Sequence, residues 1–298
     1  MPRLKKLHFT PVNLMVTAAI VLLLFAFFAW WQFVYMSPSR IFGRMLATSL
    51  SSVSVTRRTV QSDTGQQLVQ TMQLTTSPVT QVHATALLTQ TQDTSTTVDT
   101  ESIGTPTTDY VRYNSIKTTQ KNAAGKAFDF SSILGIWGRT EQNDASGGPQ
   151  LYSQALFGVV PTGDLPASQR EALIEFIGDN DVYHFDASNV THKRVNGRPV
   201  YTYKVQVMPV AYVGMLKQFA RDAGLQQLEQ VDPTQYANSQ ALSFTFEIDG
   251  WSGELTKVSY NDSPREDTYT SYGVRNTTAL PTSSIPVDEL QTRLQNLQ

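Results

Sequence analysis

The chain has 298 residues, a formal net charge of -2 at pH 7 and no cysteine. The charge argues against the clustered basic surface that nucleic-acid binding requires, so no nucleic acid is expected as a partner. The lack of cysteine excludes a disulfide framework, a thiolate zinc site, a cysteine nucleophile and a thiol-linked lipid anchor.

An uncharged apolar segment occupies residues 14–36, LMVTAAIVLLLFAFFAWWQFVYM. As a helix it would measure roughly 34 Å, slightly more than the ~30 Å hydrocarbon core of a bilayer. The apolar part of a signal peptide is usually about 7 to 15 residues long, and the bulky residues 30–35 are typical of an aromatic belt at a membrane interface. We therefore predict an uncleaved transmembrane anchor. Cleavage near Ser37-Pro38-Ser39 is the alternative.

The orientation of this anchor follows from its short basic flank, which contains Arg3, Lys5 and Lys6. Such an N-terminus usually stays in the cytoplasm, while a long C-terminal domain is translocated. We predict a single-pass cell-membrane protein with its main domain outside the cytoplasm and the lipid bilayer as its first partner. The predicted parts are a cytoplasmic tail (1–13), the anchor (14–36), an amphipathic helix (37–50), a β domain (51–278) and a C-terminal tail with a second amphipathic helix (279–298).

After the anchor, the pattern predicts a short helix and then antiparallel strands. Apolar residues from Ile41 to Leu46 recur at helical spacing, so this helix should lie on the lipid surface or pack on the domain. Threonine, a β-branched residue, occupies 16 of the 49 positions of residues 71–119, where apolar residues also alternate. A glycosylated or disordered stalk is the alternative. The predicted strands are 52–61, 66–76, 80–91, 95–103 and 108–117.

The second half mixes helices and strands. Asn196-Gly197 is a strong hairpin signal because both turn positions need a positive φ. Leu242 to Ile248 alternate between apolar and polar residues, which is typical of a half-buried strand. The other predicted elements are helices at 166–178, 209–223 and 286–297, hairpin strands at 182–194 and 198–208, and later strands at 255–260 and 267–274. The last helix should dock on the domain or bind a protein partner.

Few residues suggest chemistry. His184, Asp186 and His192 lie near one another in the sequence, but a metal site needs a further ligand, and solvent-facing strand positions explain these residues equally well. No nucleophile, phosphate-binding or dinucleotide-binding motif is present. We therefore expect no catalytic residues, no enzyme activity, no metal and no cofactor.

The order of these elements resembles the LolA, LolB and LppX-type lipoprotein fold over residues 40–275. The resemblance is carried mainly by the strand in VNGRPVYTYKVQV and the hairpin in FEIDGWSGELTKVSY. It implies an α+β fold, mainly antiparallel β, in which helices cover the concave face of a strongly curved, open half-barrel sheet. In the carriers of that family this face holds lipid or acyl chains. LolB and LppX-type proteins have a lipidated cysteine and LolA is soluble, whereas this chain has the predicted anchor helix.

The predicted function is a membrane-anchored extracytoplasmic binding protein for a lipid or other hydrophobic ligand. The alternative is a cell-surface interaction or structural protein in which the same face is ordinary core and no ligand cavity exists. The predicted ligand-binding residues are Tyr201, Tyr203, Val205, Leu216, Phe219, Phe244, Phe246 and Ile248.

Overall fold

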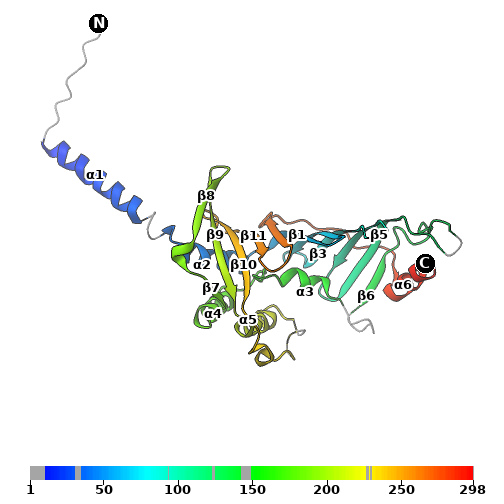
Figure 1. The fold of residues 1–298 in the computed structure, drawn as a ribbon. Helices are drawn as coiled ribbons and strands as arrows, with labels where there is room; N and C mark the ends of the chain where they lie inside the picture. The colour runs from blue at the N-terminus through cyan, green and yellow to red at the C-terminus, as the bar shows by residue number, and fades with distance from the viewer. Residues whose placement is uncertain are drawn as a thin grey trace, which may run out of the picture.

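The computed structural model describes residues 11–30, 35–92, 94–122, 125–141, 149–225, 228 and 230–297. Its main feature is one open 13-stranded sheet with the order β13-β6-β5-β4-β3-β2-β1-β12-β11-β10-β9-β7, and β8 pairs with β9 off this path (Figure 1). Neighbouring strands are antiparallel except β13 and β6, which are parallel. The predicted α+β fold with a mainly antiparallel open sheet is therefore confirmed. The strong curvature of a half-barrel stays a prediction.

The first five strands form the predicted meander. They are β1 Ser54–Asp63, β2 Gln66–Thr75, β3 Gln81–Gln90, β4 Thr96–Gly104 and β5 Thr108–Thr118. The Thr-rich segment is thus sheet, as β-branched residues favour, rather than a stalk. Two short strands, β6 Gly138–Glu141 and β13 Ile285–Pro286, extend this end of the sheet.

The other end of the sheet contains β7 Tyr183–His184, β8 Thr191–Val195, β9 Arg198–Val207, β10 Leu242–Asp249, β11 Leu255–Tyr260 and β12 Arg265–Thr270. The predicted β8–β9 turn is confirmed, with φ of 51° at Asn196 and 81° at Gly197. A continuous strand over residues 182–194 is wrong. A 3₁₀ turn at Ala187–Asn189 interrupts it, because the Asp186 side chain accepts a hydrogen bond from the Ser188 amide and caps that turn.

Six α-helices are present in the described residues: α1 Pro11–Trp30, α2 Pro38–Leu50, α3 Leu151–Leu156, α4 Ala167–Asp179, α5 Pro209–Asp222 and α6 Val287–Gln295. The sequence predicted α2, α4, α5 and α6 and missed the short α3. The sequence allowed α2 to lie on the lipid surface or to pack on the domain. In the structure it packs on the domain, since Ile41 and Met45 are completely buried. Figure 1 shows α4 and α5 on one half of the sheet and α6 near the opposite end.

The N-terminal helix α1 precedes the domain. Within the described residues, no helix combines the length and the hydropathy that crossing a membrane requires. Residues 31–34 of the predicted anchor and residues 1–10 of the predicted tail lie outside the described residues.

Two separate hydrophobic clusters stabilise the domain. The larger one joins α2, α4 and α5 to the strands from β9 to β3. The smaller one lies at the far end of the sheet, where Leu290 of α6 packs with Phe130 and Ile133. The amphipathic C-terminal helix therefore docks on the domain with its buried residue Leu290.

Candidate ligand-binding face

The predicted ligand-binding residues lie together on one side of the sheet, which we call the inner face. In the β9–β10 pair, Tyr201 is opposite Ile248, Tyr203 opposite Phe246, and Val205 opposite Phe244. Side chains of directly opposed residues point to the same face, so these six form one continuous patch. The other two, Leu216 and Phe219, belong to α5, and Phe219 is in the same cluster.

Side chains of α2 fill the space over this patch. The ring of Phe42 lies with its centroid 5.5 Å from that of Tyr203 and 6.2 Å from that of Phe246, nearly parallel to the latter. Tyr203, Phe246 and Phe219 are completely buried, and Leu216 is half-buried. The resemblance implied that helices cover this face, and α2 is one of the helices that do so. Contact of these eight residues with a ligand stays a prediction.

The buried tyrosines of the patch find their hydrogen-bond partners in the backbone of the entering chain. The Tyr201 hydroxyl donates to the Met36 carbonyl oxygen at 3.2 Å, and the Tyr203 hydroxyl donates to that of Pro38 at 2.9 Å. Burial raises the pKa of both phenols. These bonds fix the start of α2 against β9, since a buried hydroxyl without a partner would be unfavourable.

The inner face continues across the whole sheet. From Phe246 the opposed residues run through Val258 and Asp267 to Thr59 and Gln70. Residues two positions apart on a strand share a face, so the next row on β2 to β5 lies on the same side. This row is apolar and consists of Leu68, Leu88, Val98 and Ile116, opposed in that order. All four are half-buried, and we call them the open row.

A cavity of about 270 Å³ adjoins the open row. Its lining includes Val98, Tyr113 and Ile116 of the sheet, together with Phe128, Phe130 and Leu294 of α6. Thr96, Thr118 and Gln120 complete the lining, which contains no charged side chain among the described residues. An apolar cavity with a few polar groups is the usual form of a small-ligand site. Sequence analysis missed it because residues 128–130 and 294 are far apart in the chain.

A polar junction separates the packed part of the inner face from the open row. Arg57 of β1 donates to the carbonyl oxygens of Gln154 at 2.7 Å and Phe157 at 3.1 Å, which holds α3 on the sheet. The completely buried Asp267 pairs with Arg265 at 3.0 Å. These charged groups are thus engaged within the protein. Strand alternation alone did not indicate them, since Arg57 looks like an ordinary solvent-facing residue.

The three residues considered for a metal have different partners. His184 Nδ1 lies 2.8 Å from an oxygen of Asp181, Asp186 caps the 3₁₀ turn, and the His192 ring stacks on Tyr201. Within the described residues, no cluster of three or more potential ligands is present.

Comparison with known proteins gives a likeness to solved structures. No family model matches the chain, and neither does any curated protein. Among solved structures, the chain is similar to LprF from Mycobacterium bovis, with 12% sequence identity, 82% of this chain and 96% of that chain covered, and a TM-score of 0.42. The resemblance of the sequence to the LolA, LolB and LppX-type fold stays a prediction. A TM-score below 0.5 at this identity does not extend the likeness to a ligand or a function.

Proposed function

We propose that the protein binds the acyl chain of a lipid, or a ligand of similar shape and apolarity, on the inner face of its sheet. The single observation that carries this function is the open row, which leads into the apolar cavity under α6. A half-exposed apolar row over four strands is unfavourable in water and becomes favourable when an apolar ligand covers it.

The size of the surface suits an acyl chain. Three interstrand spacings of about 4.8 Å give roughly 14 Å along the open row, and the cavity extends this length. Each methylene that leaves water contributes about 0.8 kcal/mol, so ten of them would contribute roughly 8 kcal/mol before the cost of ordering the chain. Binding of this kind needs no charged contact, in agreement with the uncharged lining.

A half-barrel sheet would place both parts of the inner face around the same ligand. The eight residues predicted from the sequence would then extend the site beyond the polar junction. A ligand reaches them only if α2 moves, because Phe42 occupies the space next to Tyr203 and Phe246. We therefore propose the open row as the primary site. The buried carboxylates Asp249 and Asp267 are both paired with arginines, which supports a binding role without catalysis.

The proposal includes a membrane anchor at the N-terminus, with the binding domain outside the cytoplasm. The uncharged sequence of residues 14–36 supports it, and so do the side chains of α1 from Ile20 to Phe25, all apolar and each at least half exposed. Such a surface needs an apolar environment. A lipid ligand would come from that same bilayer.

The test compares two neighbouring residues of β3 that point to opposite faces. Leu88→Asp places a charge in the open row, and Leu87→Asp places the same charge on the other face, where Leu87 is already 43% exposed. The full-length protein and both variants are purified from the native host in mild detergent. Lipids retained by each are measured by native mass spectrometry, and binding of a fluorescent C16 fatty acid is titrated.

We expect bound lipid in the wild type and in Leu87→Asp, and a loss of at least tenfold in affinity for Leu88→Asp with the urea midpoint unchanged. Absence of lipid and of fatty-acid binding in the wild type, or equal binding by both variants, would refute the proposed site. The alternative is then a cell-surface interaction or structural protein, which the dense packing of Phe42 against the inner face favours.

A further inference from the structure

We infer that the end of the domain next to α1 is a cationic collar that contacts the headgroups of an anionic phospholipid bilayer. This inference rests on the proposed membrane anchor and is independent of the ligand. The collar consists of Arg40, Arg44, Lys193, Arg194 and Arg198, with Val195 and Trp251 as its exposed apolar members.

The collar lies beside the point at which the chain enters the domain. The Arg44 guanidinium lies 4.3 Å from the centroid of the Tyr35 ring, just before α2. The Tyr201 hydroxyl binds the Met36 carbonyl, and the His192 ring stacks on Tyr201 at 5.3 Å. The β8–β9 hairpin therefore lies beside the residues that lead from α1. Any bilayer that holds α1 is brought to this end of the domain.

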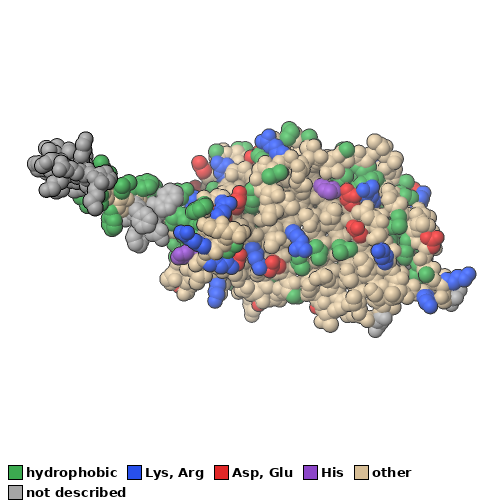
Figure 2. Space-filling model, turned by 90° about the horizontal axis from the view of Figure 1, so that it is seen from above, with side chains coloured by type: hydrophobic (Ala, Val, Ile, Leu, Met, Phe, Trp, Pro, Cys, Tyr) green, Lys and Arg blue, Asp and Glu red, His purple; other side chains and the backbone are tan. Residues whose placement is uncertain are grey.

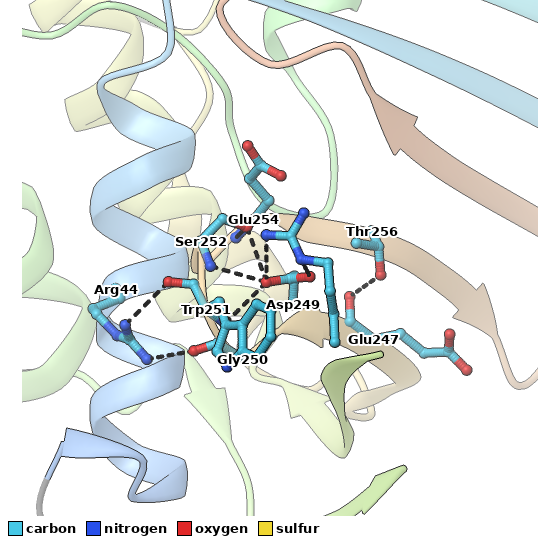
Figure 3. Close-up of polar contacts among 9 residues, drawn as sticks. Arg44, Glu247, Asp249, Gly250, Trp251, Ser252, Glu254 and Thr256 are labelled. Carbon is cyan, nitrogen blue, oxygen red and sulfur yellow. Dashed lines mark hydrogen bonds and ion pairs between the residues drawn. The ribbon is translucent and has the colours of Figure 1, made fainter. Parts of the chain in front are cut away.

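The turn after β10 is fixed within the same collar (Figure 3). Arg44 donates through Nη2 to the Gly250 carbonyl at 2.8 Å, and the buried Asp249 carboxylate accepts from the amides of Trp251 and Ser252, each at 2.9 Å. The backbone of this turn is thus held, while the Trp251 side chain remains 52% exposed. The Arg198 guanidinium carbon lies 5.9 Å from the centroid of the Trp251 ring. An exposed tryptophan beside arginines is typical of a membrane interface.

The charge of the collar is opposite to that of the whole protein. Its five cationic side chains and the three carboxylates of residues 247–254, Glu247, Asp249 and Glu254, sum to a formal charge of +2, against -2 for the chain. Two carboxylates are already paired, Glu247 with Lys193 at 3.2 Å and Asp249 with Arg198 at 2.8 Å.

Arg40 and Arg194 have no carboxylate partner among the described residues, and both are exposed. All five residues of β8 are exposed as well. Figure 2 shows Lys and Arg side chains gathered where α1 joins the domain. A bilayer with anionic headgroups attracts each such cation when it lies within a Debye length, about 8 to 10 Å at ordinary salt.

The absence of cysteine allows a direct test with a single label. Val195→Cys at the hairpin tip, 41% exposed, is labelled with an environment-sensitive fluorophore in the full-length protein. The protein is reconstituted into vesicles of phosphatidylcholine alone or with 30% phosphatidylglycerol, each containing a headgroup-linked quencher. Leu87→Cys on β3, on the other side of the polar junction, carries the same label as the control. Flotation on a density gradient measures anchoring separately.

We expect strong quenching of the label at residue 195 in anionic vesicles, weak quenching in neutral vesicles, and no difference at residue 87. In the quenching assay, Arg40→Gln and Arg194→Gln should each lower the ratio of membrane-contacting to free hairpin by about fivefold, and high salt should do the same. The matched change Lys117→Gln, at an exposed position of β5, should have no effect.

The outcomes separate the two proposals. A protein that does not float with the vesicles refutes the anchor and the collar together. A protein that floats but shows equal quenching in both lipids, or no response to Arg194→Gln, refutes the collar alone and leaves the anchor and the acyl-chain site standing.

Discussion

Tyr269 in the polar junction shows how one buried side chain makes stability depend on pH. Its hydroxyl is completely buried, and Arg57 is the neighbouring cation. Burial raises the pKa of this phenol to about 12, because the charged form would lose its water, and the neighbouring Asp267 raises it further against the opposing effect of Arg57. An unfolded chain releases the proton near pH 10. The contribution of the neutral Tyr269 phenol to the free energy of unfolding is therefore complete below pH 10 and is lost as the pH rises toward 12.

Tyr269→Phe should remove this part of the alkaline sensitivity. We expect the variant to unfold at a similar urea concentration to the wild type at pH 7, and to lose roughly 2 to 3 kcal/mol less of its unfolding free energy between pH 9 and pH 12. The measurement is a series of urea titrations across that range. Tyr236→Phe, at an exposed position, is the control. A wild-type slope in Tyr269→Phe would contradict the assignment.

At the residue scale, alternation indicated correctly that Tyr203 and Phe246 share a face but did not reveal what covers them. The spacing of apolar residues in 41–46 indicates which side of α2 is apolar. It does not indicate which strand that side packs against. The contact of Phe42 with both residues therefore needed the structure. Arg57 was missed for a related reason. A single charged residue in a strand pattern does not indicate that its side chain will donate hydrogen bonds to backbone carbonyls at α3.

At the scale of elements, α2 connects an exposed apolar helix to the buried core of the domain. It is the next helix after the exposed apolar helix α1, and its own apolar side is buried against the sheet. The Phe42 ring contacts Tyr183, Phe185, Tyr203 and Phe246 with centroid distances from 4.6 to 6.2 Å. This helix therefore contributes to the core of the domain as α4 and α5 do.

Phe42→Ala should lower the unfolding free energy by about 3 to 5 kcal/mol, because it leaves an unfilled space among four aromatic rings. Phe42→Leu, which retains most of the volume, should cost clearly less. Both are measured by urea unfolding followed by circular dichroism. An unchanged midpoint in Phe42→Ala would mean that α2 does not hold the inner face closed. Added binding of the C16 fatty acid by this variant would extend the ligand site to the eight predicted residues.

At the scale of the whole molecule, two clusters of unequal size share one sheet. The smaller cluster has three buried residues, Phe130, Ile133 and Leu290, with partly buried side chains around them. Gly138 of β6 allows Leu290 to approach, since a Cβ there would lie 2.9 Å from a methyl carbon of Leu290. Regions with few buried apolar contacts open locally before the whole protein unfolds.

Leu290→Ala should therefore loosen only the far end of the sheet. We expect faster amide hydrogen exchange in β13, α6 and residues 128–137, with unchanged exchange in β9 and β10 and a nearly unchanged global unfolding midpoint. Exchange is followed by mass spectrometry of peptides. Thr292→Ala, on the exposed side of α6, is the control. Equal acceleration in β9 would show that the two clusters unfold as one unit.

The meander from β1 to β5 and the helices α2, α4 and α5 were predictable because each carries its own period of apolar residues. The pairing of strands that are distant in the sequence was not. The pairing of β1 with β12 joins Thr59 to Asp267, and the parallel pairing of β13 with β6 joins Ile285 to Gly138. Such partners depend on the path of the chain between them, which local patterns do not record. The cavity under α6 depends on the same distant pairings and was missed for that reason.

The hydrogen bonds from Tyr201 to Met36 and from Tyr203 to Pro38 also bear on the order in which parts of the chain fold. Each joins residues 165 positions apart in the chain. During synthesis α2 emerges before every strand of the domain, and β9 and β10, against which Phe42 packs, follow only when residues 198–249 have been made. Contacts between such distant segments form slowly, since a long loop must close before they are gained. Until then, Ile41, Phe42 and Met45 lack the cover of β9 and β10 on the growing chain.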